Sequence, residues 1–177
     1  MSLWLWQFWI YSFIGYLLEK GFAAATRAEK QTRKGFLLLP LCPVYGLGVL
    51  AVLALPPTLR DNFWSLALFG SLAATAVEYA VHWAYDRLLG VRFWDYSDVK
   101  GNVRGRVCLP FSIIWGVLLA VALPWVQPPL AAVLARIPAG VTYAALLVFT
   151  VDAVASFRVL QCTGDTERLS LRRLLAV

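Results

Sequence analysis

Two glutamates occupy matching positions in two long apolar stretches of the sequence. Glu19 follows Ser12, and Glu78 follows Ser71, by the same seven positions, and no charged residue lies between the members of either pair. A third acid, Asp152, lies in another apolar stretch. An ionisable side chain is costly at membrane depth, so acids in such places are candidates for binding ligands or moving protons. We therefore predict that these three acids bind a cation or exchange protons with a substrate.

Further residues are predicted to complete this ligand site. His82 follows Glu78 by four positions, which places both on one helix face, and we interpret it as a partner of Glu78 rather than a metal ligand. Aromatic residues would wall the site, and a polar loop that includes Trp94–Asp98 would gate it on the cytoplasmic side. The walls are Tyr45 and Trp115, and the polar residues of the loop are Arg106, Asn102 and Asp95.

The acids also have a structural interpretation. They can pair with Lys20, Arg106 or Arg158 and tie helices together, and polar contacts of this kind contribute about 1 kcal/mol each. Three acids at one depth, two of them in matching positions, favour the ligand or proton site.

Cysteine chemistry is the second possibility that the sequence offers. Cys42 and Cys108 are candidate nucleophiles, activated by helix N-termini or by His82. The simpler interpretation is that they are small buried fillers, because no Cys–His–Asp spacing accompanies them. The three cysteines, with Cys162, contain no CxxC pair and predict no disulfide framework. A zinc site would need scattered ligands, so we predict no metal and no cofactor. The chain lacks the GxxxxGK[ST] motif, so ATP-driven work would require a partner.

The composition is that of an all-α membrane protein. Hydrophobic residues make up 60% of the chain and charged residues only 15%, whereas soluble domains are about a quarter charged. Stretches of about 20 apolar residues are long enough to cross a bilayer. We predict a single transmembrane domain over 1–177 with five spans, at 3–25, 37–56, 63–86, 107–126 and 139–160.

The basic residues predict the orientation. They gather in three segments that five spans place on one side of the membrane, which indicates an outside N-terminus and a cytoplasmic C-terminus. The net charge of +6 is explained by this pattern, so the expected partners are membrane lipids and no nucleic acid is expected. The predicted location is the bacterial cytoplasmic membrane. The clusters are Arg27, Lys30, Arg33 and Lys34; Arg87, Arg92, Lys100, Arg104 and Arg106; and Arg158, Arg168, Arg172 and Arg173.

The chain contains an internal repeat of a helix pair. Residues 3–56 and 63–126 are predicted as two parallel repeats related by an axis near the membrane normal, with the fifth span unpaired. The corresponding residues are Gly35, Pro40, Tyr45 and Gly46 in the first copy and Gly105, Pro110, Trp115 and Gly116 in the second.

Several segments outside the regular spans carry their own predictions. The pair Pro40 and Pro43 indicates an interrupted start of the second span, a feature that points to transporter binding sites, whereas Pro110 is typical of a simple helix start. The aromatic-rich loop 86–104 is expected to fold back on the inner face. Pro124, Pro128, Pro129 and Pro138 should punctuate an outer connection with a short helix over 130–137. The tail 165–177 is expected to be an amphipathic surface helix.

These segments carry a resemblance to a known family. The chain resembles the small bacterial membrane proteins labelled ABC-transporter type IV permeases, although Leu39 stands where that family usually has glycine and Lys34 where arginine is usual. The resemblance covers the first four predicted spans, and Asp152 is similar to an acid of the family's last span. It implies transport and names no substrate. The matching segments are Tyr11–Glu19, Gly35–Phe36, Pro40–Gly48, Trp94–Ser97, Asn102–Leu109 and Trp115–Gly116.

Three functions follow from the sequence, in order of preference. The first is a transporter or permease-like subunit whose acids are proton- or cation-coupled. The second is an intramembrane enzyme or binding protein that acts on a lipid, with Cys42, Cys108 or a Glu–His pair as the reactive group. The third is a non-catalytic membrane partner in which the acids are structural. Because five spans barely enclose a pathway, we expect a homodimer or a heteromeric complex.

Overall fold

The protein is helical, as predicted, apart from one small hairpin. The computed structural model describes residues 2–26, 35–166 and 169. Strands β1 (Asn102–Val103) and β2 (Val107–Cys108) pair antiparallel, with Asn102 opposite Cys108. The α-helices of this part of the chain are α1 (Ser2–Ala25), α2 (Pro43–Leu53), α3 (Phe63–Leu89), α4 (Leu109–Leu134) and α5 (Ala139–Thr163), and a short 3-10 helix, η1, covers Pro57–Leu59.

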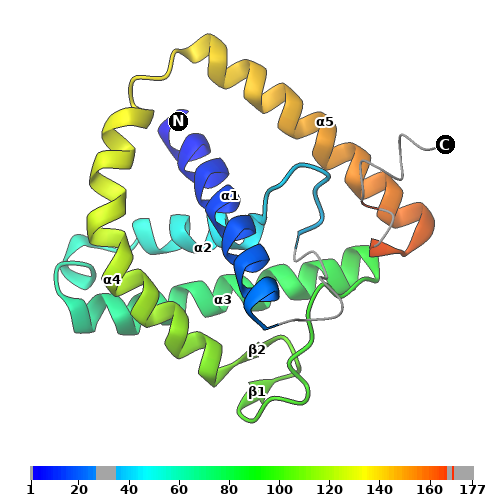
Figure 1. Cartoon of the computed structure of the whole chain (residues 1–177), viewed down its shortest axis with the longest axis horizontal. Coiled ribbons are helices and arrows are strands. Elements are labelled where there is room, and N and C mark those ends of the chain that lie inside the picture. The colour runs from blue at the N-terminus through cyan, green and yellow to red at the C-terminus, as the bar shows by residue number, and fades with distance from the viewer. Residues whose placement is uncertain (1, 27–34, 167–168, 170–177) are drawn as a thin grey trace.

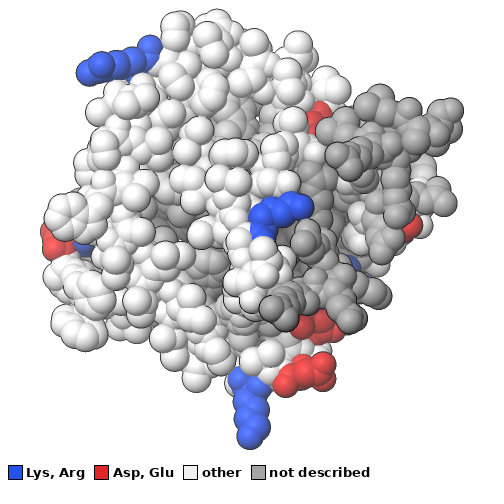
Figure 2. Space-filling model, viewed as in Figure 1, with Lys and Arg blue, Asp and Glu red and all other residues white. Residues whose placement is uncertain are grey.

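The first four helices form the packed body of the molecule. α1 packs along α2, α3 packs along α4, and α2 also contacts α3. In Figure 1, α4 and α5 form two sides of a roughly triangular outline above α3, and α1 descends between them. α5 contacts α1 and α3 over small areas only. Among the described residues, only a few acidic and basic side chains appear on the face shown in Figure 2.

Three helices of the described residues are long and apolar enough to cross a membrane. They are α3, α4 and α5, and their bounds agree with three of the five predicted spans to within a few residues, except at the end of α4. α1 has 24 residues and is not among these three. The composition and these helices fit a membrane protein, while the count of five spans stays a prediction.

The span predicted over 37–56 starts with an interruption, as the pair Pro40 and Pro43 indicated, and its helix is short. α2 has only 11 residues, about 16 Å of helix, which is roughly half of the ~30 Å hydrocarbon core. Residues 35–42 precede it as non-helical chain. Pro43 occupies the first turn of α2, where its missing N–H is harmless. Pro40 disfavours helix in the residue before it, so the proline pair delays the start of the helix.

The prediction that the helix of the fourth span ends near its prolines is wrong. Pro124, Pro128 and Pro129 lie inside α4, which continues to Leu134 and takes up most of the short helix expected over 130–137. An internal proline removes one hydrogen bond and bends a helix without always ending it. α4 accordingly changes direction in its later, yellow half (Figure 1). The chain turns instead at Pro138, the residue that precedes α5.

The loop between α3 and α4 folds back, as predicted, against the helices. Phe93, Trp94 and Tyr96 are buried and pack with Tyr85 of α3 and Leu160 of α5. A second apolar cluster joins α1 to α4 through Tyr11, Val52, Leu66, Leu119 and Leu123. The basic segment 27–34, and the predicted tail helix 165–177 except Asp165, Thr166 and Leu169, lie outside the described residues.

Two glycines allow close approach within the helix pairs. A Cβ at Gly46 of α2 would lie 2.4 Å from the Phe8 carbonyl oxygen of α1, and a Cβ at Gly116 of α4 would lie 2.5 Å from the Ala67 carbonyl oxygen of α3. Backbone atoms cannot move aside as a flexible side chain can, so both positions exclude any larger residue.

We expect Gly46→Ala and Gly116→Ala each to lower the free energy of unfolding in detergent by about 1–3 kcal/mol, the usual cost of overpacking. The measurement is thermal unfolding followed by circular dichroism. Gly21→Ala in α1 and Gly140→Ala in α5 are matched controls, because no atom lies within 4 Å of a Cβ at either position. Equal melting temperatures for all four variants would contradict the close approach.

Candidate functional site

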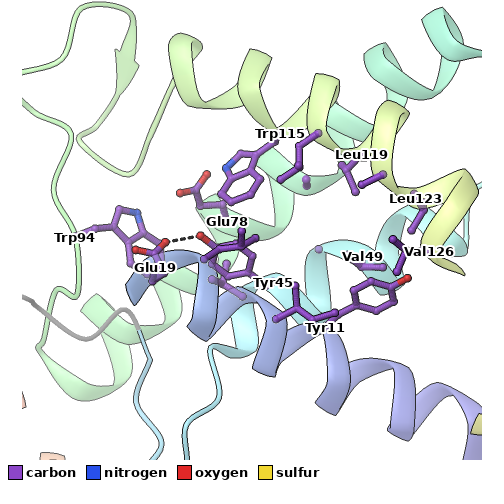
Figure 3. Close-up of a pocket in the computed structure, with 17 residues that line it drawn as sticks. Tyr11, Glu19, Tyr45, Val49, Glu78, Trp94, Trp115, Leu119, Leu123 and Val126 are labelled. Carbon is purple, nitrogen blue, oxygen red and sulfur yellow. Dashed lines mark hydrogen bonds between the residues drawn. The ribbon is translucent and has the colours of Figure 1, made fainter. Parts of the chain in front are cut away.

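A cavity of about 280 Å³ lies among α1, α2, α3 and α4. Glu19, Glu78, Tyr45 and Trp115, four of the predicted site residues, line it together. Figure 3 shows that these residues and Trp94 occupy one end, while Tyr11, Val49, Leu119, Leu123 and Val126 occupy the other. The remaining lining residues are Ile14, Leu18, Val44, Gly48, Ala74, Leu118 and Ala122.

Each cavity carboxylate accepts a hydrogen bond from a tyrosine of a different segment. The hydroxyl of Tyr45, in α2, donates to Oε1 of half-buried Glu19, in α1 (Figure 3). The hydroxyl of Tyr96, in the α3–α4 loop, donates to Oε1 of buried Glu78 at 3.1 Å. Burial, with the nearby Glu78 carboxylate, raises the pKa of Tyr96 above its usual range, so this hydroxyl keeps its proton and acts as a donor.

Aromatic rings enclose the acidic end of the cavity. The rings of Tyr45 and Trp115 meet edge to face, with centroids 4.9 Å apart. Tyr45 rests directly on Gly15 of α1, where a Cβ would lie 2.2 Å from the Tyr45 Cγ. The Trp94 indole is fixed by its Nε1–H, which donates to the Arg106 carbonyl oxygen at 2.9 Å. The position of each ring is therefore set by packing or by a hydrogen bond.

The other end of the cavity is apolar, with one polar tip. The Tyr11 hydroxyl donates to Oε1 of Gln127 at 2.8 Å, which links α1 to the proline-rich part of α4. Leu119 and Leu123 of α4 and Val49 of α2 form the walls around it. The cavity therefore combines a charged, aromatic end with a hydrocarbon end.

Asp152 lies outside this cavity and binds the non-helical segment 35–42. Its Oδ1 accepts from the Leu38 amide at 3.0 Å, and its Oδ2 accepts from the Leu39 amide at 3.2 Å. Ser156, one turn further along α5, also accepts from the Leu38 amide at 3.1 Å. Backbone amides outside regular helices need other hydrogen-bond acceptors, and α5 supplies them here. The structure does not bring Asp152 to Glu19 and Glu78.

The three predicted loop residues organise the loop itself. Asn102 donates to the carbonyl oxygens of Ser97 and Val99 and accepts from the Gly105 amide. Asp95 accepts from the Ser97 hydroxyl and amide, and these hydrogen bonds lower the pKa of its carboxyl. A Cβ at Gly105 would lie 2.6 Å from Oδ1 of Asp95, and its φ of +68° suits glycine.

Arg106 fastens this loop to α3. Its guanidinium donates to the Tyr79 hydroxyl and to Oδ2 of Asp86, both at 3.1 Å. None of Arg106, Asn102 and Asp95 lines the cavity. They act on it indirectly, because the loop they hold carries Trp94 and Tyr96.

His82 and the buried cysteines also lie outside the cavity. The His82 Nε2–H donates to the Trp94 carbonyl oxygen at 3.0 Å, so this nitrogen binds the loop rather than Glu78. Cys42 and Cys108 are each about 2% exposed and do not line the cavity. Among the described residues, no three His, Cys, Asp or Glu side chains gather closely enough to hold a metal ion.

The sequence interpretation did not name Tyr11 as a site residue, and it gave Trp94 and Tyr96 only as part of the gating loop. Tyr11 and Trp94 line the cavity, and Tyr96 donates to Glu78. The aromatic-rich composition of the loop carried the signal for two of them. Tyr11 was quoted only within the segment Tyr11–Glu19, and one tyrosine in an apolar helix is ordinary in a membrane protein.

The helices and the buried acids define a helical membrane protein. The chain belongs to the family described as "Putative ABC-transporter type IV", whose model matches residues 6–158. This match includes every residue that lines the cavity. Comparison with curated proteins and with solved structures gave no match. The family is thus established, and the chemistry of the cavity must be argued from its residues.

We expect Asp152→Ala to loosen segment 35–42 and expose the adjacent Cys42. The variant removes two hydrogen bonds to the segment, each contributing about 1 kcal/mol, which would raise the open population, and the rate of Cys42 alkylation by N-ethylmaleimide, about tenfold. The measurement uses a Cys108→Ser, Cys162→Ser background. Thr150→Ala in the same helix is the control, since its hydroxyl donates only within α5, to Leu146. Equal alkylation of Asp152→Ala and Thr150→Ala would contradict the role of Asp152 in holding segment 35–42.

Proposed function

We propose that the protein is a transporter or permease-like subunit and that Glu19 and Glu78 form its proton- or cation-coupled site. The observation that carries the proposal is that both glutamates line one cavity, each hydrogen-bonded to a tyrosine of another segment. Membership of the transporter-type family supports it.

The proposal gives each glutamate a link to a different part of the fold. An ionised carboxylate only accepts hydrogen bonds, whereas a protonated one also donates. Charge changes at Glu19 therefore act on α2 through Tyr45, and charge changes at Glu78 act on the α3–α4 loop through Tyr96. Binding of a proton or cation would in this way shift the walls of the cavity.

The two helix pairs support an internal repeat. Gly46 of α2 lies against the Ser12 side chain and the Phe8 carbonyl of α1, and Gly116 of α4 lies against the side chain of Ser71 and the carbonyl of Ala67 in α3. Ser12 and Phe8 correspond to Ser71 and Ala67 when α1 and α3 are aligned at Glu19 and Glu78, and Gly46 corresponds to Gly116 once the longer loop of the second pair is allowed for. Parallel repeats place equivalent residues around a shared axis, which suits one cavity with two acids.

The five-span topology belongs to this proposal in a modified form. α1, with 24 residues, is about 36 Å long, enough to cross a bilayer. Segment 35–42 and α2 would form an interrupted crossing, held by Asp152. The N-terminus would lie outside and the C-terminus in the bacterial cytoplasm, and a second copy or another subunit would complete the pathway.

The lipid-enzyme alternative has one observation in its favour, the hydrocarbon end of the cavity. Its covalent version lacks a nucleophile in place, because Cys42 and Cys108 do not line the cavity. The non-catalytic partner has no specific contact that favours it over transport.

We expect the tryptophan fluorescence of the wild-type protein to show a transition on acidification that Glu19→Gln/Glu78→Gln lacks. Trp94 and Trp115 lie at the acidic end of the cavity, so protonation of the carboxylates changes the charge beside them. The measurement is a titration between about pH 4 and 9 in detergent, within the range of carboxyl and histidine pKa values. Asp61→Asn, an exposed acid between α2 and α3, is the control. Superimposable curves for the wild type and the double variant would defeat the proposal.

A further inference from the structure

α1 and α4 meet along a loosely packed seam beside the cavity. Each packs extensively on its own neighbour, α1 on α2 and α4 on α3, but α1 and α4 contact each other over a small area. At one end of the seam Tyr11 of α1 donates to Gln127 of α4. At the other end the rings of Phe22 and Phe111 meet edge to face, with centroids 6.3 Å apart. The two contacts therefore lie about 16 Å apart along α1, at about 1.5 Å per residue.

The cavity reaches the surface of the molecule within this seam. Leu18 of α1 and Leu118 and Val126 of α4 line the cavity, yet they are 44%, 38% and 40% exposed. A residue that lines a cavity and is also exposed lies at the mouth of that cavity. All three residues fall between the two seam contacts along their helices, so the mouth lies between α1 and α4.

The surface around the mouth is apolar. Leu17 adjoins the mouth on α1, while Ile114 and Val121 lie one turn to either side of Leu118 on α4. Each of these three residues is more than half exposed. Because α4 is long and apolar enough to cross a membrane, this surface would face lipid chains, which are as apolar as leucine. The mouth would therefore open into the bilayer rather than into water.

The lining and the volume of the cavity describe an apolar organic molecule. Apart from the two glutamates, its described lining residues are aliphatic, aromatic or glycine. A cavity of about 280 Å³ suits a body of about ten to twelve non-hydrogen atoms, since ~150 Å³ of apolar cavity is enough for benzene. A charged ligand would lose its hydration at the apolar mouth, which is costly. An uncharged molecule does not meet this barrier.

We propose that the protein takes up an uncharged apolar organic molecule of this size from the bilayer, through the mouth between Leu18 and Leu118. The inference rests on the proposed function, and it names the substrate class and the route by which the substrate enters. The molecule would lie against Leu119 and Leu123 of α4, at the hydrocarbon end of the cavity (Figure 3).

Phenyl(trifluoromethyl)diazirine, an apolar carbene precursor close to this size, tests the cavity of the wild type in phosphatidylcholine nanodiscs. We expect mass spectrometry to find photolabel on Leu119 and Leu123, although both are less than a tenth exposed, within a few-fold of the label on exposed Val154 of α5. Leu66 is buried in the same apolar cluster but does not line the cavity, so it should carry little label. Labelling of Leu119 and Leu123 no stronger than that of Leu66 would overturn the inference.

A narrowed cavity tests whether this label reports binding inside the protein. Ala122 lines the cavity, and Ala122→Phe should lower the labelling of Leu119 and Leu123 several-fold while leaving that of Val154 unchanged. Ala144→Phe, on the exposed face of α5, is the matched control and should have no effect. Equal labelling of Leu119 and Leu123 in the two variants would count against the cavity as the binding site.

A blocked mouth tests the route of entry. Leu118→Trp should slow the appearance of label on Leu119 when the probe is added shortly before illumination. Leu72→Trp, at an exposed leucine of α3 outside the cavity, is the matched control. Equal rates for the two variants would rule out entry between α1 and α4.

Two further comparisons separate this inference from its neighbours. A diazirine carried on an acyl chain of phosphatidylcholine should label Leu119 and Leu123 weakly, and labelling equal to that by the free probe would make the occupant a lipid chain and overturn the inference. If the free probe leaves both leucines unlabelled while the fluorescence titration separates the wild type from Glu19→Gln/Glu78→Gln, the substrate class is wrong and the proposed proton site stands. If the leucines are labelled but the titration curves coincide, the apolar site stands and the proposed function falls.

Discussion

The structure depends on one constraint: a carboxylate buried in an apolar bundle must receive hydrogen bonds from elsewhere in the chain. Glu19 receives one from Tyr45, Glu78 from Tyr96, and Asp152 from the amides of Leu38 and Leu39. Each acid thereby joins its own helix to a segment that is distant or irregular. α1 is joined to α2, α3 to the loop before α4, and α5 to the chain that leads into α2.

The third acid shows how position along a helix differs from position in space. Asp152 has the same apolar context as the glutamates, and the sequence placed all three in one site. Segment 35–42 lacks helical hydrogen bonds and leaves amide groups to be satisfied, and α5 presents Asp152 and Ser156 to them. The rotation of a helix about its axis, and the neighbour it meets, depend on packing that a single sequence does not specify.

The bounds of α3 and α5 were predictable from the sequence, because they follow from the length of the apolar stretch that the bilayer or the bundle core requires of such a helix. Tyr45, Trp115, Glu19 and Glu78, which the repeat interpretation grouped into one site, line one cavity. The course of α4 through Pro124 was missed, because proline weakens a helix locally while surrounding contacts, such as that between Tyr11 and Gln127, hold the next turn in place. The loop residues Asn102, Asp95 and Arg106 were recognised as special, but their partners are the loop and α3 rather than a ligand.

The family relation and the cavity contribute different parts of the functional account. The family match places the chain in the family described as "Putative ABC-transporter type IV" and specifies no ligand. The cavity supplies charge, aromatic walls and a hydrocarbon end, which together describe a ligand by its chemistry. The loop between α3 and α4 completes the acidic end of the cavity, because Trp94 lines it and the Tyr96 hydroxyl donates to Glu78.

The most direct test of the shared carboxylate cavity is native mass spectrometry of the gently solubilised protein, with the wild type beside Glu19→Gln/Glu78→Gln. The account predicts that the wild type retains a bound species that the double variant has lost, and the same spectra report the oligomeric state. Identical bound species on both proteins would contradict it.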